Sequence, residues 1–277
     1  MAGFGAEPQG FTPRRDDMIL AIDIGNTNIV IGCYNGEDLS FVFRMSTNID
    51  KTADEYAFGV SNLLGFHGVG RSAVKGAVIS SVVPPLTGVF RAAVELLSGV
   101  GAVIVGAGLK TGLNILIDDP AALGSDMVSS AVGALSLCKP PIIIVDMGTA
   151  TKITVIDKNG SFIGGAIMPG IQVSMNALTR DTSMLPKVPI DAPPKVICAN
   201  TIDCMKSGAV FGTASMIDGM TERFERELGG KARIIATGGF SDVVVPHCTR
   251  EMDHEPYLIL MGLRLIYNKN KGFRKEG

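Results

Sequence analysis

The chain contains the same short pattern twice, about half its length apart. Residues 18–34 and 141–157 each consist of an apolar run rich in Ile and Val, an Asp-x-Gly sequence followed closely by threonine, and a second apolar run. Short apolar runs of this kind predict buried strands, and the glycine between them predicts a turn. The sequence therefore predicts two strand–turn–strand units, with Asp23 and Asp146 at their turns.

These two turns differ from the common nucleotide-binding loops. In a P-loop or a dinucleotide-binding motif the strand leads into a helix, whose N-terminus holds the phosphate. Here a strand follows a strand, so neither motif applies. Each turn offers instead one carboxylate, backbone N–H groups and Thr or Asn side chains. Carboxylate oxygens bind Mg²⁺, while amide and hydroxyl donors bind phosphate oxygens, so the pattern favours a metal-bound polyphosphate.

A single copy of this pattern is explained most simply as a hairpin with a polar turn. Two copies in matching context favour a duplicated phosphate-binding fold instead. The length of 277 residues suits two halves, which we place at 18–123 and 124–277. Residues 1–17 are rich in Gly, Pro and charge, and we interpret them as a disordered extension or an artificial leader, with Met18 as the native start.

Composition excludes several classes of function. The net charge is −2 and no long basic or acidic run occurs, so nucleic acid and anionic membranes are not expected as partners and a small molecule is. No apolar stretch reaches about 18 residues without charged or turn residues, so a transmembrane helix is not expected. The five cysteines lack CxxC spacing, which is typical of reduced thiols in a cytoplasmic protein. The three histidines lack the spacing of zinc ligands.

The segments around the two motifs predict a mixed sheet with helices on its faces. A capping-box pattern at Thr52 predicts a helix over 52–66. A second helix is predicted over 124–138, with Ser125 or Asp126 as its N-cap.

Two Asp-bearing hairpins followed by a Thr-Gly-Gly turn at 237–239 resemble the fold shared by actin, hexokinase, acetate kinase and Hsp70. The fold class implied is α/β, with duplicated actin/ribonuclease-H-like mixed sheets, flanking helices and two halves around an ATP cleft. Within this group, nine blocks between Met18 and about Asn270 are similar, in order, to those of the type III pantothenate kinase family. They are DIGNTNIVIG (23–32), RMSTNIDKTADEYAF (44–58), ISSVVPPL (79–86), TGLNIL (111–116), DMGTAT (146–151), GGAIMPGI (164–171), TSMLPKV (182–188), IATGGF (235–240) and GLRLIYNKN (262–270).

The resemblance implies phosphorylation of the primary hydroxyl of pantothenate by Mg-ATP, which gives 4'-phosphopantothenate in the first step of coenzyme A synthesis. It implies that the first motif, the second motif and the later Gly-Gly turn bind ATP, with Asp23 reaching Mg²⁺ through the nucleotide. The residues concerned are Asp23, Ile24, Gly25, Asn26, Thr27, Asn28, Ile29, Val30, Thr149, Gly238 and Gly239.

The resemblance also assigns the acceptor side. Asp146 matches the family's site for a monovalent cation, K⁺ or NH₄⁺, and Asp126 matches its proton acceptor. Taken alone, Asp126 is explained as a plain helix cap, but beside both hairpins we favour the base. Thr182 matches a threonine that a partner subunit supplies to the pantothenate pocket, so a homodimer is implied. The substrate residues are Ile117, Gly124, Ser125, Asp126, Met127 and Thr182.

The chain departs from the family mainly on the acceptor side. Met127 stands where the family usually has an arginine, and a thioether cannot replace a bidentate charged contact. Ile117 stands where a tyrosine lines the pocket, so that hydroxyl is lost. Lys152 replaces a small polar residue of the second phosphate motif, and Cys198-Ala199 replaces Gly-Lys.

These departures leave three hypotheses. The first is an active pantothenate kinase with a modified pocket, since Asp23, Asp126, Asp146, Thr149 and Thr182 are all present. The second is a catalytically impaired paralogue that acts as a nucleotide-binding or regulatory dimer. The third is a kinase of the same fold that acts on another small alcohol.

Overall fold

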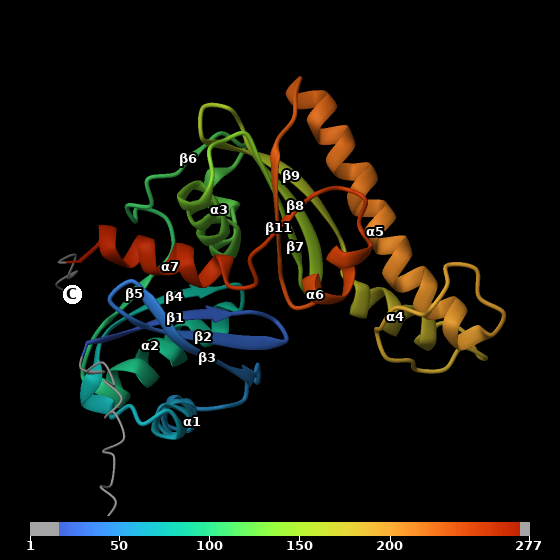
Figure 1. Ribbon diagram of the computed structural model, residues 1–277. Coiled ribbons are helices and arrows are strands. Elements are labelled where there is room, and N and C mark those ends of the chain that lie inside the picture. Colours follow the sequence, from blue (N-terminus) through green and yellow to red (C-terminus); the bar gives the residue numbers. More distant parts are fainter. Residues whose placement is uncertain (1–16, 272–277) are drawn as a thin grey trace, which may run out of the picture.

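Two mixed β-sheets, each with its own helices, form the framework of the protein (Figure 1). The computed structural model describes residues 17–271. The prediction made for residues 1–17 therefore falls, except for Asp17, outside the described residues.

The first sheet is built from the N-terminal part of the chain. Its strand order is β3-β2-β1-β4-β5, and α1 and α2 belong to the same part. The elements are β1 (Met18–Ile24), β2 (Asn28–Asn35), β3 (Asp38–Ser46), α1 (Ala53–Phe66), the 3₁₀ helix η1 (Arg71–Ala73), β4 (Val74–Ser81), α2 (Pro84–Ser98) and β5 (Ala102–Ile104).

The second sheet has the order β11-β10-β7-β8-β9-β6. Its strands are β6 (Asn114–Ile115), β7 (Ile142–Met147), β8 (Ala150–Ile156), β9 (Ser161–Pro169), β10 (Arg233–Thr237) and β11 (Asp253–His254). The helices of this part are η2 (Pro120–Ala122), α3 (Ser125–Leu137), α4 (Ile171–Arg180), α5 (Thr201–Leu228), α6 (Ser241–Val244), η3 (Val245–His247) and α7 (Leu258–Lys269).

The two sheets repeat one topology. In the first, β1 pairs antiparallel with β2 and parallel with β4, and β2 pairs antiparallel with β3. In the second, β7 pairs in the same way with β8 and β10, and β8 with β9. Asp23 in β1 and Asp146 in β7 therefore occupy equivalent places. The predicted fold class, two duplicated mixed sheets with flanking helices, is confirmed.

Two elements connect the halves across the predicted boundary at 123/124, and the boundary itself stays a prediction. β6 precedes the boundary but pairs with β9 of the second sheet. α7 ends the described chain but packs against β1 and β4 of the first sheet, where Leu260 and Leu263 join Ala21 and Val78 in one buried cluster. Figure 1 shows α3 and α7 side by side between the two sheets. The close contact of α3 with α7 uses Gly262, since a Cβ there would overlap a backbone carbonyl of α3.

Of the two predicted helix N-caps, the one of α1 is confirmed and the one of α3 is wrong. α1 has the expected capping box, because Thr52 Oγ1 accepts from the Glu55 N–H and the Glu55 carboxylate accepts from the Thr52 N–H. The predicted cap of α3 is wrong, because its N-cap is Gly124 and no side chain caps it. Ser125 and Asp126 lie one and two residues inside the helix, and their side chains have other partners.

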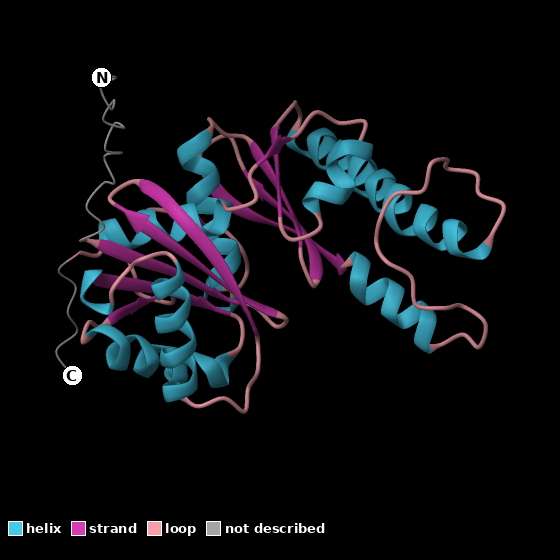
Figure 2. Ribbon diagram, turned by 60° about the horizontal axis from the view of Figure 1, so that its bottom comes forward, coloured by secondary structure: helices cyan, strands magenta, loops and turns pink. Residues whose placement is uncertain are grey.

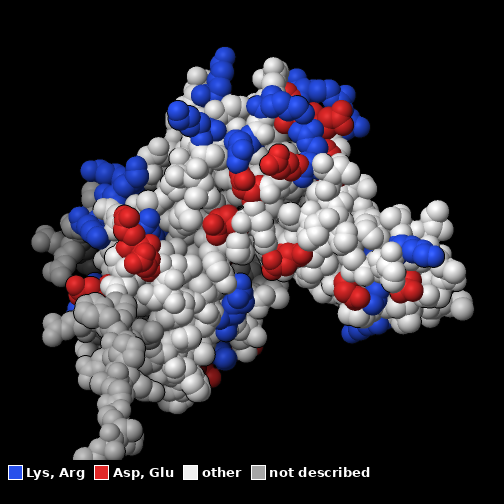
Figure 3. All heavy atoms as spheres, viewed as in Figure 1, with Lys and Arg blue, Asp and Glu red and all other residues white. Residues whose placement is uncertain are grey.

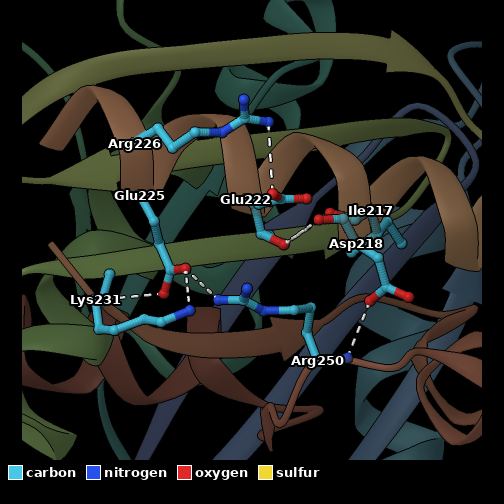
Figure 4. Close-up of polar contacts among 9 residues, drawn as sticks. Ile217, Asp218, Glu222, Glu225, Arg226, Lys231 and Arg250 are labelled. Atoms are coloured by element: carbon cyan, nitrogen blue, oxygen red, sulfur yellow. Dashed lines mark hydrogen bonds and ion pairs between the residues drawn. The ribbon is translucent and has the colours of Figure 1, made fainter. Parts of the chain in front are cut away.

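A charged network holds the C-terminal end of α5 to the loops around β10 and β11 (Figure 4). The buried Glu225 carboxylate accepts from Lys231 Nζ, from the Ala232 N–H and from Arg250. Two turns earlier in α5, Asp218 accepts from the Arg250 N–H. These bonds fix the segments that lead into β10 and β11, and β10 is followed directly by the Gly-Gly turn of the site.

α4 and the start of α5 project from the second sheet as an arm, with a long loop between them (Figure 2). Large apolar side chains are exposed on this arm, with Met184 90% and Ile197 91% exposed. Between residues 17 and 271, no helix is both long and apolar enough to cross a membrane.

Candidate active site

The two Asp-bearing hairpins meet at their tips. Thr27 follows β1 and Thr149 follows β7, and their hydroxyl oxygens lie 3.0 Å apart. Both threonines are exposed. The first tip is closed by a hydrogen bond of 3.0 Å from the Gly25 N–H to the Asn28 carbonyl oxygen. The structure thus brings together the two phosphate motifs that the sequence predicted.

The exposed polar groups of the first tip are separated from its apolar neighbours. Asn26, Thr27 and Asn28 are exposed. Ile24 and Ile29 are completely buried in the core of the first half. Only the backbone of these two isoleucines is therefore able to face a nucleotide.

Two aspartates share one lysine beside these tips. Lys152 Nζ lies 2.5 Å from Asp126 Oδ2 and 2.8 Å from Asp146 Oδ2. The side chains of Lys152, Asp126 and Asp146 are largely buried. Burial alone would lower the pKa of Lys152, but attraction to Asp146 and Asp126 outweighs it and holds that pKa above its ordinary value. The lysine therefore carries its charge and is shared by two carboxylates.

Asp23 is the carboxylate that lacks such a partner. Its Oδ1 is buried and accepts no hydrogen bond. Burial, with repulsion from Asp126 and Asp146, raises the pKa of Asp23 to about 7, although a hydrogen bond from Ser80 and the charge of Lys152 act in the opposite direction. A buried oxygen that accepts nothing within the described part of the protein fits a cation or a donor brought by a ligand.

Two glycines give the carboxylates their positions. A Cβ on Gly124 would collide with the Asp126 carboxylate, whose Oδ1 accepts from the Met127 N–H at 2.8 Å. Gly238 has a φ of +95°, and a Cβ there would lie 2.6 Å from Asp146 Oδ1. The Gly-Gly turn after β10 therefore lies directly against Asp146. Gly239, next to it, faces open space.

Ser125 attaches the start of α3 to the first sheet. Its Oγ lies 3.0 Å from Ser80 Oγ, accepts from the Ser81 N–H and donates to the Ser81 carbonyl oxygen. Ser80 pairs with Asp23 across β1 and β4. A serine predicted to contact substrate thus also fixes Asp126 relative to Asp23. The role of Ser80 was missed, although Ser80 lies in the block ISSVVPPL (79–86).

The two residues that depart from the family on the predicted acceptor side pack against the same buried cluster. Met127 and Ile117 both pack against the buried cluster formed by α3, β7 and their neighbours. The chain itself does not bring Thr182 into contact with them. Thr182 follows α4 on the arm, is exposed, and donates its hydroxyl to the Leu178 carbonyl oxygen. The role predicted for Thr182 requires a second copy of the chain.

The donor set suits a metal that arrives with a nucleotide. Within residues 17–271, no group of three or more His, Cys, Asp or Glu side chains is arranged to hold a metal ion by itself. The free oxygen of Asp23, next to exposed hydroxyl and amide groups, fits Mg²⁺ whose other ligands are phosphate oxygens and water. The second carboxylate, Asp146, is already in contact with an ammonium group.

Solved structures share this fold at low sequence identity. Component A of (R)-2-hydroxyglutaryl-CoA dehydratase from Acidaminococcus fermentans matches with a TM-score of 0.56 and 14% identity, over 93% of this chain and 100% of that one. A reductive activator for a corrinoid, iron-sulfur protein matches with a TM-score of 0.52 and 11% identity, over 94% of this chain and 62% of that one. The duplicated sheets and paired hairpins define an ATPase-like fold of the actin and hexokinase class.

Sequence comparison is more specific. The family model for type III pantothenate kinase matches residues 19–223. A type III pantothenate kinase from Roseiflexus castenholzii is 42% identical over 254 residues, which is 92% of this chain and 100% of the relative. The corresponding protein of Geobacter sulfurreducens is 39% identical over the same number of residues, 92% of this chain and 100% of its own. The chain belongs to the type III pantothenate kinase family.

Proposed function

We propose that the protein transfers the γ-phosphoryl group of Mg-ATP to the primary hydroxyl of pantothenate, beside the two hairpin tips. The observation that carries the proposal is that the two hairpin tips meet at Thr27 and Thr149, and that Asp146 of the second hairpin and Asp126 of α3 share one lysine there. Family membership supplies the substrate class. Figure 3 shows acidic and basic side chains interspersed over one face of the molecule.

In this proposal the ATP phosphates lie against the tips. Thr27 and Thr149 offer hydroxyl donors from the two halves, 3.0 Å apart, so that one phosphate group is within reach of both. Asp23 holds the Mg²⁺ that ATP brings. When bound, this metal neutralises charge on the phosphate oxygens. Gly238 and Gly239 leave room for the nucleotide beside Asp146, since Gly239 faces open space.

Asp126 serves as the proton acceptor. The substrate hydroxyl oxygen forms a bond to the γ-phosphorus, the bond from this phosphorus to the β–γ bridging oxygen breaks, and ADP leaves. The hydroxyl proton passes to the Asp126 carboxylate. Phosphoryl transfer needs little covalent help, so the main contribution of the protein is to align the two oxygens and screen their charge.

We also propose a homodimer in which the arm of one copy completes the pocket of the other. A groove of about 900 Å³ between α4, the following loop and α5 is lined mainly by apolar side chains. Met184 and Ile197, with about nine-tenths of their surfaces exposed, flank this region. An apolar surface of this kind is typical of contacts between subunits. Thr182 on the same arm would then reach the partner's acceptor site.

One observation favours a second candidate function. Met127 and Ile117 give the acceptor side an apolar surface, where an arginine and a tyrosine would bind a carboxylate. A neutral alcohol such as pantetheine suits this surface better than pantothenate does. An impaired paralogue that only binds nucleotide is the remaining alternative. We place the activity in the cytoplasm, in keeping with five free cysteines.

The test is ADP release with Mg-ATP and KCl, with pantothenate, pantetheine or no acceptor, together with mass-spectrometric detection of the phosphorylated product. We expect phosphopantothenate from the wild type and a loss of about 10²-fold or more in kcat for Asp126→Asn. Lys75→Thr, a change of an exposed residue near the start of β4, serves as control. Product from pantetheine alone would select the second candidate, and no product from any acceptor would contradict both. Sedimentation of the wild type and Met184→Glu tests the dimer.

A further inference from the structure

Asp146, the residue predicted to bind a monovalent cation, already has a cationic partner. Lys152 Nζ lies 2.8 Å from Asp146 Oδ2 and 2.5 Å from Asp126 Oδ2. The ammonium therefore lies between the carboxylate expected to hold K⁺ or NH₄⁺ and the proposed proton acceptor.

The position of Lys152 is fixed by the hairpin. Asp146 and Lys152 are direct partners in the antiparallel ladder of β7 and β8, so their side chains lie on the same face of the sheet. The corresponding partner of Asp23 in the first hairpin is Val30, which has no charge. The lysine is thus a local feature of the second hairpin and not a consequence of the shared fold.

An ammonium held in this way supplies what a bound monovalent cation would supply. It has the same charge as K⁺ and the same donor chemistry as NH₄⁺, and it is covalently attached at its site. The Lys152 side chain is largely buried, and its ammonium lies at hydrogen-bond distance from two carboxylates. A free cation would have to displace this ammonium from both. The residues present therefore do not fit an additional monovalent cation at Asp146.

We propose that Lys152 is a built-in replacement for the monovalent cation, so that nucleotide binding and phosphoryl transfer by this protein do not depend on K⁺ or NH₄⁺. This proposal rests on the proposed function only where phosphopantothenate formation is measured. The measurement of nucleotide binding requires that the protein binds nucleotide, whatever its acceptor substrate is.

The experiment compares the wild type with Lys152→Thr, which places a small polar residue beside Asp146. Lys75→Thr is the matched control, since the Lys75 ammonium donates to the Ser72 carbonyl oxygen outside the site. The first readout is the Kd of a non-hydrolysable Mg-ATP analogue, measured by calorimetry in choline chloride and in KCl at equal ionic strength. The second is phosphopantothenate formation under the same conditions.

For the wild type and Lys75→Thr, we expect Kd to differ by less than about twofold between the two salts. For Lys152→Thr, removal of a charge-assisted contact should weaken binding in choline chloride by about ten- to hundredfold, and KCl or NH₄Cl should restore most of the loss. Turnover should follow the same pattern.

Tightening of wild-type binding by KCl of tenfold or more would overturn the proposal. The proposal would also be overturned if Lys152→Thr bound the Mg-ATP analogue as tightly as the wild type does and its Kd did not change with KCl or NH₄Cl. If Lys152→Thr does not fold, the wild-type salt comparison decides alone. A salt effect on binding confined to Lys152→Thr, without pantothenate turnover by any variant, would support the role of Lys152 and contradict the proposed function.

Discussion

Replacement of Asp23 by asparagine should make the nucleotide-free protein more stable at neutral pH. The carboxylate is isosteric with the amide, but its Oδ1 is buried without a hydrogen bond and two other carboxylates are close enough to repel it. The protein therefore tolerates an unfavourable charge at this position in the absence of ligand. Asp23→Asn removes that charge and leaves the shape of β1 intact.

The size and sign of the effect follow from the pKa of Asp23. The pKa is about 7 in the folded protein and 3.8 in an ordinary environment. Folded protein thus retains the proton in a pH range where the unfolded chain has lost it, so the free energy of unfolding falls as pH rises from about 4 to 7. At 1.36 kcal/mol per pKa unit, the full difference is at most about 4 kcal/mol at pH 8. Asp23→Asn should remove this slope.

The assay is thermal unfolding of wild type and Asp23→Asn in EDTA at several pH values between 5 and 8. We expect the gain in Tm to be larger at pH 8 than at pH 5 by about 5 °C or more, because about 1 kcal/mol shifts the Tm of a chain of this size by 2–4 °C. Asp157→Asn is the control of opposite sign. Hydrogen bonds from the Ser161 and Asn159 N–H groups contribute to a lowered pKa of Asp157, so its removal should destabilise the protein at pH 7. A Tm difference for Asp23→Asn that is negative or independent of pH would refute the reasoning.

Four further substitutions test other parts of the structure. Gly262→Ala should destabilise the protein by about 2 kcal/mol in urea unfolding, because its Cβ would overlap backbone in α3, whereas Gly219→Ala in α5, with open space around it, should stabilise by about 0.5–1 kcal/mol. Glu225→Gln should cost about 2 kcal/mol at pH 7 through weaker bonds to Arg250 and Lys231. The pKa of Glu225 lies below its ordinary value of 4.5. The loss of stability caused by Glu225→Gln should therefore shrink as the pH of the unfolding experiment falls below 4.5. Gly238→Ala should weaken binding of the Mg-ATP analogue in calorimetry by more than about tenfold, since its Cβ would lie 2.6 Å from Asp146 Oδ1.

The duplicated fold was predictable because its signal is local and occurs twice. Each hairpin is specified by its own apolar runs and glycine, and the order of the remaining strands follows from the duplication. Thr27 and Thr149 follow the first strands of the two hairpins, and the structure brings their hydroxyl groups together. The capping box of α1 depends on two residues three positions apart, and it too is confirmed.

The failures concern contacts between residues that are distant in sequence. Ser125 was predicted as a possible N-cap, but its hydroxyl forms hydrogen bonds with Ser80 and Ser81 of β4. The N-cap residue of α3 is Gly124. The return of α7 to the first sheet has no local signal. Lys152 was recognised as unusual, but nothing in its neighbourhood in the sequence indicated that Asp126, on another element, would share its ammonium group.

The two halves show how one change of neighbour separates the roles of equivalent aspartates. Asp23 and Asp146 occupy the same place in the repeated topology, yet the residue opposite Asp23 is Val30 and the residue opposite Asp146 is Lys152. Beside valine, the Asp23 carboxylate has no cationic partner opposite it, and burial raises its pKa to about 7. Beside lysine, the Asp146 carboxylate is paired within the chain. A cation that enters with ATP should therefore bind Asp23, whose unpaired charge it neutralises. Asp146 and Lys152 stay paired with each other beside it.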